Sequence, residues 1–268
     1  MYALDKRNSF LLIVFFSFFI TYSQPRVSII TSVYNADTYI EGFLNNITKQ
    51  TIFVDCELIL INAASPGNEY EVIKTYLKQY KNITYIALGK DPGIYGVWNY
   101  ALTVARADYI TNANVDDRRN PESLEEQVAY LEQHPEIDLV YSDYVTTLVM
   151  NQDYPGDSNS LRAVTLDFSA QHLFMCFPGP HPLWRKSIHT KYGLFDASFS
   201  SLGDLEMWNR AAAGGAVFKK LTGLSGLYYD NPEGISTNQY PEKVAKRQAE
   251  AQRIIENYRS LWGSAWGS

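Results

Sequence analysis

The sequence lacks several patterns that mark whole classes of protein. It has only two cysteines, Cys56 and Cys176, without the spacing of a zinc site, so we expect free thiols and no structural metal centre. Its formal net charge of −6 argues against a nucleic-acid partner held by a general basic surface. No internal repeat or low-complexity tract is apparent, and an ordinary globular domain is the class that remains.

Long hydrophobic runs are also missing, apart from a short one near the N-terminus. Residues 10–20 are mostly apolar, with Lys6 and Arg7 before them and small or polar residues after them. A helix that spans a bilayer needs about 20 apolar residues, and this run is shorter. Residues 1–24 therefore predict either a signal segment of an exported protein or a shallow membrane tether on the cytoplasmic side, and a start codon placed too early is the third option.

What the sequence does contain is an alternation of apolar runs and amphipathic segments. Runs that predict buried strands lie at residues 27–33, 56–61, 83–87 and 109–115. Segments that predict helices lie at residues 39–47, 70–80 and 97–105. This alternation is typical of a Rossmann-like α/β domain, with a mostly parallel central sheet and helices on both faces. At 268 residues and 46% hydrophobic composition, the chain can bury a substantial core in one such domain, which we place at residues 25–237.

The fourth predicted strand ends in two adjacent carboxylates, Asp116 and Asp117. Ligands bind at the C-terminal ends of strands in open α/β sheets, where the turns after the four strands would line one edge. Carboxylates at such an edge can hold a divalent cation that neutralises a phosphorylated substrate. The alternative is a purely structural role, because Asp-Asp after a strand is also found in solvated turns and helix caps.

Six segments, in this order, resemble the family 2 glycosyltransferases, whose nucleotide-binding domain has the GT-A fold. They lie at residues 31–35, 91–99, 114–117, 178–187, 192–196 and 203–210. The first follows the opening strand, the second is a glycine-containing entry to a helix, and the third stands where the family carries its metal motif. The resemblance covers most of the chain, from about residue 26 to residue 235.

The resemblance implies a metal-dependent, inverting hexosyltransferase that uses a nucleoside-diphosphate sugar and Mn²⁺ or Mg²⁺. It makes Asp116 the metal ligand and Asp204 the catalytic base. The residues it implies for donor-nucleotide binding are Thr31, Ser32, Tyr34, Asn35, Asn62, Asp91, Gly93, Asn99 and Asn114. The residues it implies on the acceptor side, or supporting it, are Asp117, His181, Trp184, Glu206 and Trp208. The product is expected to be a cell-surface glycan or polysaccharide, and a glycan, a lipid-linked sugar or a protein remains possible as the acceptor.

The residue types suit this chemistry, although each has a structural alternative. An acceptor hydroxyl must lose its proton as it attacks, and charge builds on the leaving diphosphate, so a base and a metal ligand do separate work. Asp204 also suits the N-terminal cap of a helix beginning near Leu205. Arg118 and Arg119 are expected at the cleft mouth, where one meets a phosphate or both are solvated. His181 can contact the acceptor, or can be a structural or exposed histidine in a loop.

Two positions depart from the family pattern and leave the nucleotide open. The second strand of the family often ends in an aspartate that binds uracil, but this sequence has Asn62, whose amide fits more than one base edge. The first acidic position of the metal motif is Asn114, which adds no charge, so the donor diphosphate is expected to complete the coordination.

The C-terminal part predicts a loop and a helix. Residues 227–236 are rich in turn-forming types, and we expect either a loop that closes over the donor or a plain surface loop. Residues 238–268 form a C-terminal helical extension, with a helix predicted at 241–262 after a proline start. That helix either docks on the domain or uses its lysines and arginines to contact a membrane surface or a partner.

Other function classes explain less of the sequence. A dinucleotide-dependent oxidoreductase needs a glycine-rich turn after the first strand, and residues 31–35 contain no glycine. A glycoside hydrolase could use Asp116 and Asp204, but the nucleotide-like turns would then have no role. The serious rival is a non-catalytic sugar-nucleotide or glycan-binding module, which would keep the cleft without metal-dependent turnover.

Overall fold

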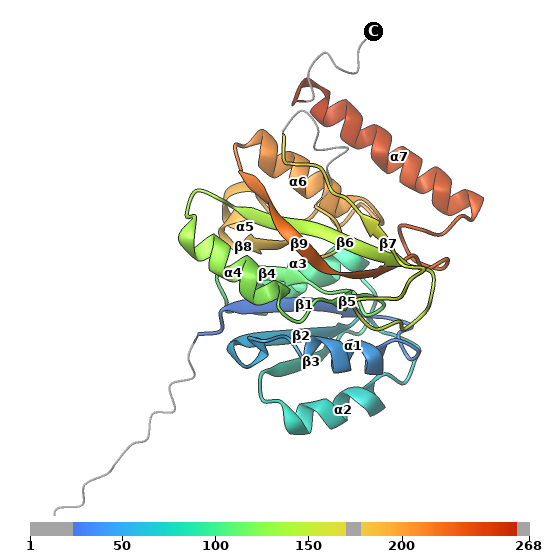
Figure 1. The fold of residues 1–268 in the computed structure, drawn as a ribbon. Helices are drawn as coiled ribbons and strands as arrows, with labels where there is room; N and C mark the ends of the chain where they lie inside the picture. Colours follow the sequence, from blue (N-terminus) through green and yellow to red (C-terminus); the bar gives the residue numbers. More distant parts are fainter. Residues whose placement is uncertain (1–23, 170–177, 262–268) are drawn as a thin grey trace, which may run out of the picture.

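Strand β1 (Val27–Val33) lies inside a single central sheet (Figure 1). The structure is a computed structural model, and it describes residues 24–169 and 178–261. Within those residues the sheet has nine strands, in the order β3-β2-β1-β4-β8-β6-β9-β5, with β7 paired to β6 at the side. The sheet therefore has two parts, one built by the opening repeats and one built by later, more distant segments.

The first part confirms the predicted alternation of strands and helices. Strands β2 (Cys56–Asn62), β3 (Ile83–Ala87) and β4 (Tyr109–Asn112) join β1 in parallel pairings. The helices between them are α1 (Ile40–Ile47), α2 (Tyr70–Gln79) and α3 (Ile94–Val104), with a short 3₁₀ turn, η1 (Phe53–Asp55), before β2. All four strands consequently end at the same edge of the sheet, and the turns after them are gathered there.

The second part is mixed in direction. It contains β5 (Arg118–Arg119), β6 (Leu139–Thr147), β7 (Leu161–Ala163), β8 (Leu183–Arg185) and β9 (Phe218–Tyr229). Strands β6 and β9 are parallel, whereas β8 is antiparallel to β4 and β6, β7 to β6, and β5 to β9. The mostly parallel sheet expected from the opening repeats thus holds for the first part and only for β6 and β9 in the second.

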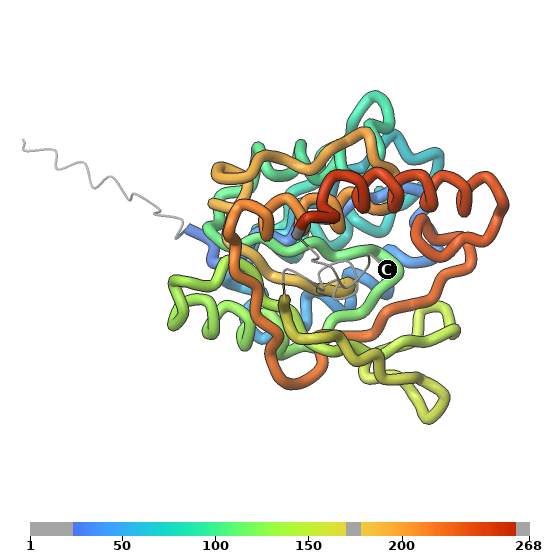
Figure 2. The backbone as a smooth tube through the Cα atoms, turned by 90° about the horizontal axis from the view of Figure 1, so that it is seen from above, coloured from blue at the N-terminus to red at the C-terminus, as the bar shows by residue number. Residues whose placement is uncertain are grey.

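Four further helices complete the layers: α4 (Ser123–Gln133), α5 (Ser187–Tyr192), α6 (Gly203–Ala213) and α7 (Pro241–Tyr258), followed by η3 (Arg259–Leu261). Alternate strand residues feed two cores, because successive side chains point to opposite faces. Ile29 packs with α1, α2 and α4 on one face, and Ile30 packs with α3, α5 and α6 on the other. The α7 helix lies on α6 in Figure 1 and faces the viewer in Figure 2, and its Ile254 joins the second core.

The C-terminal expectations are partly corrected. The predicted helix is confirmed as α7, but residues 227–229 belong to β9 and not to a loop, because they pair with β6 and β5. Two of these three residues are tyrosines, a type that is enriched in strands.

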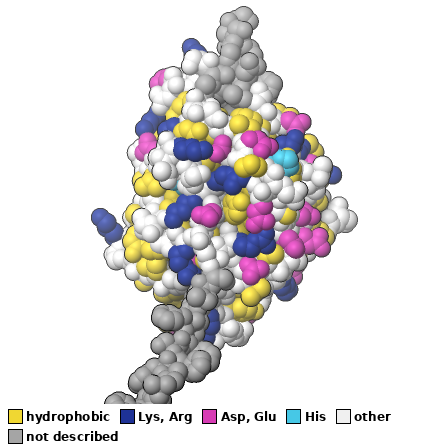
Figure 3. Space-filling view, turned by 90° about the vertical axis from the view of Figure 1, so that its left-hand side faces the viewer, with side chains coloured by type: hydrophobic (Ala, Val, Ile, Leu, Met, Phe, Trp, Pro, Cys, Tyr) yellow, Lys and Arg dark blue, Asp and Glu magenta, His cyan; other side chains and the backbone are white. Residues whose placement is uncertain are grey.

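Several predictions concern the chain ends and the cysteines. Cys56 is buried and free, while Cys176 lies outside the described residues, as does the signal or tether predicted at 1–23. None of the helices within residues 24–169 and 178–261 is long and apolar enough to cross a bilayer. On the face from which the N-terminal end of the described chain leaves, charges of both signs are interspersed (Figure 3).

Candidate active site

The turns after β1 and β2 are bound together at the shared edge of the sheet. The backbone N–H of Asn35 donates to Ser65 Oγ at 3.0 Å, and that of Ala36 donates to Glu69 Oε1 at 2.7 Å. Ser65 Oγ also donates to Glu69 Oε1 at 2.6 Å. Asn35 has a φ of 49°, a left-handed conformation that asparagine tolerates better than most residues. The fully buried Glu69 thereby makes the two turns one rigid wall.

The nucleotide-binding residues predicted in the first turn differ in access. Thr31 is fully buried, and its Oγ1 finds no hydrogen-bond partner among the described residues. Ser32 is half-buried, whereas Tyr34 and Asn35 are exposed. Thr31 is therefore the member of this set that a ligand at the edge cannot reach, and Tyr34 and Asn35 are the most exposed.

The side chain of Asn62, at the end of β2, is hydrogen-bonded to neighbouring residues. Its Oδ1 accepts the backbone N–H of Ser65 at 2.8 Å, and its Nδ2 donates to the hydroxyl of Tyr85 at 2.9 Å. A carbonyl oxygen has two lone pairs, so Oδ1 retains one acceptor position. Asn62 thus shapes the turn first and has limited capacity left for a base edge.

The helix entry at residues 91–99 is built as its sequence suggests. Asp91 Oδ1 accepts the backbone N–H of Gly93 at 2.8 Å, and Gly93 has a φ of 76°, which a side chain would strain. Both residues are exposed at the start of α3. Asn99 behaves differently, since its amide donates to the carbonyl of Phe195 at 2.8 Å and its Oδ1 accepts the N–H of the same residue at 3.0 Å. Both polar ends of Asn99 are thus bound to the backbone of Phe195, and its predicted contact with the donor stays a prediction.

The carboxylate pair divides into a buried and an accessible member. Asp117 is only 4% exposed and accepts hydrogen bonds from Asn114 Nδ2 and from the backbone N–H of Tyr229, both at 3.1 Å. Burial, and then the charge of Asp116, raise its pKa well above the ordinary value for an aspartate. Asp117 therefore fastens the end of β9 to the turn after β4.

Asp116 is half-buried and points toward the segment after β9. Its Oδ2 accepts a hydrogen bond from Asn231 Nδ2 at 3.0 Å. Within the described parts of the chain, no cluster of three or more His, Cys, Asp or Glu side chains could hold a metal by itself. A cation at Asp116 would need further oxygen ligands from a substrate or from water.

The two arginines after the pair are not at a cleft mouth, and that expectation is wrong. Arg118 and Arg119 are 1% and 2% exposed. Arg119 donates to Thr111 Oγ1 at 2.9 Å, to Gln127 Oε1 at 2.8 Å and to the carbonyl of His181 at 3.0 Å. Burial lowers its pKa to about 9. A buried guanidinium needs such a set of acceptors, and here they come from β4, from α4 and from the segment before β8.

Asp204 lies in the first turn of α6 and touches the entry of α3. Its Oδ1 accepts the hydroxyl of Tyr95 at 3.1 Å and the backbone N–H of Leu205 at 2.8 Å. Burial raises its pKa to about 6, and these two hydrogen bonds oppose that rise. A carboxylate whose pKa lies near neutrality is a better proton acceptor than an ordinary aspartate and is still ionised at pH 7. Asp204 is not the helix cap, because α6 already begins at Gly203 after Leu202; it lies in the first turn, where a negative charge suits the helix dipole.

The other acceptor-side residues lie behind the surface. His181 is 3% exposed, Trp184 is 0% and Trp208 is 1%, and the two indoles pack with ring centroids 5.2 Å apart in the core. Glu206 accepts hydrogen bonds from Arg210 at 3.0 Å and from the hydroxyl of Tyr258 on α7 at 2.7 Å. Their burial favours the supporting role among the predicted alternatives, and a role on the acceptor side stays a prediction.

Three side chains in or beside the site escaped the sequence argument: Tyr95, Asn231 and Glu250. Tyr95 and Asn231 sit in segments whose role was expected, but their partners Asp204 and Asp116 are distant in sequence. Glu250 carried a usable signal, because it falls on the same stripe of α7 as Ile254, where a carboxylate is out of place unless it has partners.

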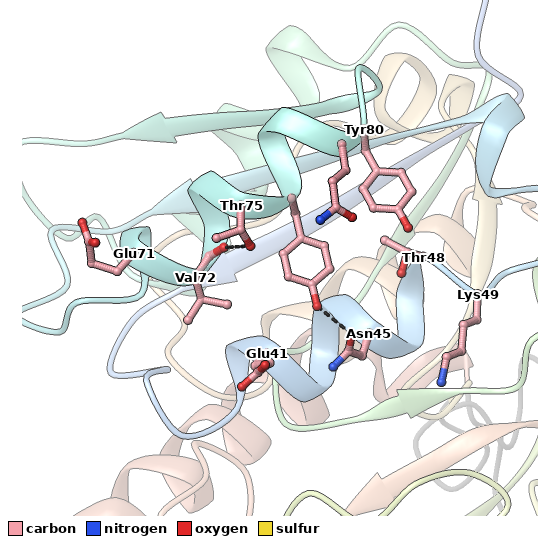
Figure 4. A pocket seen from close by; sticks show the side chains of 10 residues that line it. Glu41, Asn45, Thr48, Lys49, Glu71, Val72, Thr75 and Tyr80 are labelled. Atoms are coloured by element: carbon pink, nitrogen blue, oxygen red, sulfur yellow. Dashed lines mark hydrogen bonds between the residues drawn. The ribbon is translucent and has the colours of Figure 1, made fainter.

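A separate hollow lies away from these carboxylates. A groove of about 500 Å³ runs between α1 and α2, with Glu41 and Asn45 on one side and Val72 and Thr75 on the other (Figure 4). None of the predicted site residues lines it.

Comparison with known proteins agrees with the geometry. The family model described as glycosyl transferase family 2 matches residues 28–193. The uncharacterized glycosyltransferase YwdF of Bacillus subtilis is 26% identical over 87% of this chain and 84% of its own length. The uncharacterized glycosyltransferase MJ1057 of Methanocaldococcus jannaschii is 26% identical over 71% of this chain, which spans 66% of that relative.

Two solved structures share the fold. S. aureus TarS 1-349 in complex with UDP-GlcNAc superposes with a TM-score of 0.68 at 15% identity, covering 90% of this chain and 73% of that one. The mannosyltransferase PcManGT from Pyrobaculum calidifontis, in complex with GDP-Man and Mn²⁺, gives a TM-score of 0.61 at 14% identity, covering 91% and 76%. The fold is therefore GT-A, as the sequence predicted, and the chain belongs to glycosyl transferase family 2.

Proposed function

We propose that this glycosyltransferase moves a sugar from a nucleoside-diphosphate sugar to an acceptor hydroxyl with inversion at the anomeric carbon. The observation that carries the proposal is Asp204, a carboxylate at the start of α6 whose pKa burial raises to about 6. A base of this strength on the acceptor side can take the hydroxyl proton as the C–O bond forms. The leaving group is the nucleoside diphosphate, which departs from the opposite face of the sugar.

Asp116 is the residue proposed to face the diphosphate. It lies at the C-terminal edge of the parallel strands, where its carboxylate has an oxygen beyond the one bound by Asn231. Mg²⁺ and Mn²⁺ take oxygen ligands, and Mg²⁺ is often held by one or two carboxylates together with substrate phosphates. The donor set at this edge fits such an ion, which would supply positive charge to the leaving diphosphate when bound.

The donor base is proposed to lie against the wall formed by the turns after β1 and β2. Tyr34 and Asn35 are exposed there, and Asn62 keeps one acceptor position. Since an amide suits more than one base, uridine and guanosine donors both belong in the test. A cell-surface polymer is the proposed product class, because one relative, 31% identical over 42% of this chain, is named as a minor teichoic acid biosynthesis protein.

The test measures release of nucleoside diphosphate from UDP-GlcNAc, UDP-glucose and GDP-mannose, with and without Mn²⁺. The unaltered protein is compared with Asp116→Ala and with Asp55→Asn, an exposed carboxylate in η1 that serves as the matched control. We expect Mn²⁺-dependent release by the parent and by the control, and loss of that release in Asp116→Ala.

Binding of a donor without release, with or without Mn²⁺ and in the presence of glycan and lipid-linked acceptors, would point to the binding-module alternative. The anomeric configuration of the transferred sugar, read by NMR in the product and compared with that of the donor, separates inversion from retention. A product with the donor's own anomeric configuration would overturn the inverting mechanism.

A further inference from the structure

The α7 helix holds the start of α6 through one buried carboxylate. Glu250 is 8% exposed, and its Oε1 accepts the backbone N–H of Ser200 at 2.6 Å and the hydroxyl of the same residue at 2.7 Å. Its Oε2 accepts the backbone N–H groups of Ser201 at 3.0 Å and Leu202 at 2.9 Å. One side chain therefore satisfies three consecutive backbone donors directly before α6.

These contacts are of a strong kind. A hydrogen bond to an ionised carboxylate is about twice as strong as one between neutral groups, and four of them converge on Glu250. A negative charge at the N-terminal end of a helix is also favoured by the helix dipole. Leu202 is the residue that precedes α6, and Asp204 is the second residue of that helix. The backbone that carries Asp204 is thus fixed by a residue from another helix.

We propose that Glu250 is a positioning residue for Asp204. It acts through the backbone of residues 200–202, which it locks so that the Asp204 carboxylate meets the acceptor hydroxyl in one orientation. The inference rests on the proposed function, in which Asp204 is the base. Displacement of a reacting group by about 1 Å can cost about 10²-fold in rate, so a side chain that fixes this turn has a large effect without touching substrate.

The charge of Glu250 also acts on Asp204. Burial is the main cause that raises the pKa of Asp204, and the charge of Glu250 adds to it. Tyr95 on α3 is the other titratable side chain that acts on Asp204, and its hydroxyl opposes the rise, as does the N–H of Leu205. Removal of the charge at 250 should therefore lower the pKa of Asp204 and move the acidic limb of the rate profile to lower pH.

The experiment compares Glu250→Ala and Glu250→Gln with Arg253→Ala. Arg253 also docks α7, because it binds Asp196 at 2.7 Å and Ser198 at 2.8 Å, but it does not touch residues 200–202. Mn²⁺-dependent release of UDP from UDP-GlcNAc and of GDP from GDP-mannose gives kcat, KM and the pH profile. Amide hydrogen exchange over residues 198–206 gives a readout that needs no turnover, and thermal unfolding reports stability.

We expect Glu250→Ala to lower kcat by about 10- to 100-fold with the donor KM changed by less than about twofold. Glu250→Gln keeps some of the hydrogen bonds, so its kcat falls less and its acidic limb moves to lower pH. Both variants should exchange the amides of Ser200, Ser201 and Leu202 faster. Arg253→Ala should unfold at a lower temperature yet keep the parent's kcat, pH profile and exchange at those amides.

Unchanged exchange at residues 200–202 in Glu250→Ala would overturn the proposal whatever the activity. Equal losses of kcat in Arg253→Ala and Glu250→Ala would also overturn it, because general docking of α7 would then explain the effect. The failure of the proposed function looks different: Asp204→Asn would keep its activity, while the exchange data would still show whether Glu250 holds the turn.

Discussion

The two parts of the sheet are held together in different ways. In the first part, residues 27–112, the strands pair in parallel, and hydrogen bonds within and between the turns, such as Asn62 with Ser65 and Ala36 with Glu69, shape the edge. In the second part, residues 118–258, distant segments meet through buried side chains, such as Glu206 with Tyr258 and Glu250 with Ser200. The proposed donor wall is thus built within residues 31–69, whereas the surroundings of the proposed base draw on segments as far apart as Tyr95 and Glu250.

A few side chains join the two parts. Tyr95 connects the entry of α3 to Asp204, Asn99 connects α3 to Phe195, and Arg119 connects Thr111 on β4 to the carbonyl of His181. Variants at these joints, and at the residues they position, can separate loss of chemistry from loss of the fold.

The largest expected effect is that of Asp204→Asn on turnover. Amide cannot take a proton, so we expect transfer to fall by about 10²- to 10⁴-fold, while binding of UDP-GlcNAc or GDP-mannose by calorimetry changes little. In the parent, kcat should fall as pH drops through about 6, because burial raises the pKa of Asp204 to that value and protonation removes the base. Near-parental transfer by the variant would refute the assignment.

The next effect concerns Arg119, the joint with the most hydrogen bonds. In Arg119→Ala, buried acceptors on Thr111, Gln127 and His181 lose their hydrogen-bond donor. We expect the free energy of unfolding to fall by about 3 kcal/mol. Urea unfolding measures it. Arg26→Ala, which removes a bridge between two partly exposed side chains, is the control and should cost less than about 1 kcal/mol. A loss at Arg119 no larger than that of the control would show that the joint adds little.

A smaller loss is expected at Asn99. Replacement by alanine leaves both polar groups of the Phe195 backbone without their partner, at a cost of about 1 to 2 kcal/mol. Asn45→Ala is the matched control, because Asn45 lies on the exposed α1 side and accepts only the hydroxyl of Tyr76 among the contacts described for its side chain. Urea midpoints that fall equally in both variants would argue against a role of Asn99 in joining the parts.

The smallest expected effect is the pH dependence of stability that comes from His189, a residue of the second part. His189 accepts the indole N–H of Trp184 at 2.9 Å, and burial lowers its pKa from 6.5 to about 4. The unfolded chain takes up this proton at higher pH than the folded one, so stability is complete above pH 6.5 and is lost as pH falls toward 4.

Between pH 7.5 and pH 5.5 we expect a loss of about 1 kcal/mol from this group, since His189 is only half-buried. The measurement is urea unfolding at both pH values for the parent and for His189→Gln, which cannot titrate. The difference between the two proteins should shrink by that amount at the lower pH, and a constant difference would contradict the assignment.

Much of the first part could be predicted from sequence because its signals are local. The apolar runs gave β1 to β4, and the residues at their ends gave the turns, since Gly93 and Asn35 are types that permit a positive φ. The order of motifs predicted the roles of Asp116 and Asp204 that the proposed function keeps. Only the structure shows that Asp117 is buried and Asp116 is half-buried. The N–H group that Asp117 binds belongs to Tyr229 on β9, which is distant in sequence.

The second part resisted prediction for a physical reason. Nothing in the local sequence around Arg118 and Arg119 distinguishes a solvated pair from a buried one, because their acceptors lie on other elements. The same holds for His181, whose ring packs beside Gly226, and, at the joint between the two parts, for Asn99, whose partner is Phe195. Polar residues buried by distant partners need the fold before their role can be read.

The four hydrogen bonds of Glu250 also have a consequence for the timing of synthesis. Asp204 and the turn before it leave the ribosome well ahead of α7, and until Glu250 follows them three backbone donors at residues 200–202 lack their acceptor. The backbone that carries the proposed base therefore gains its last contacts only when α7 has been synthesised and has docked. On the proposed mechanism, turnover depends on the last helix of the described chain to leave the ribosome.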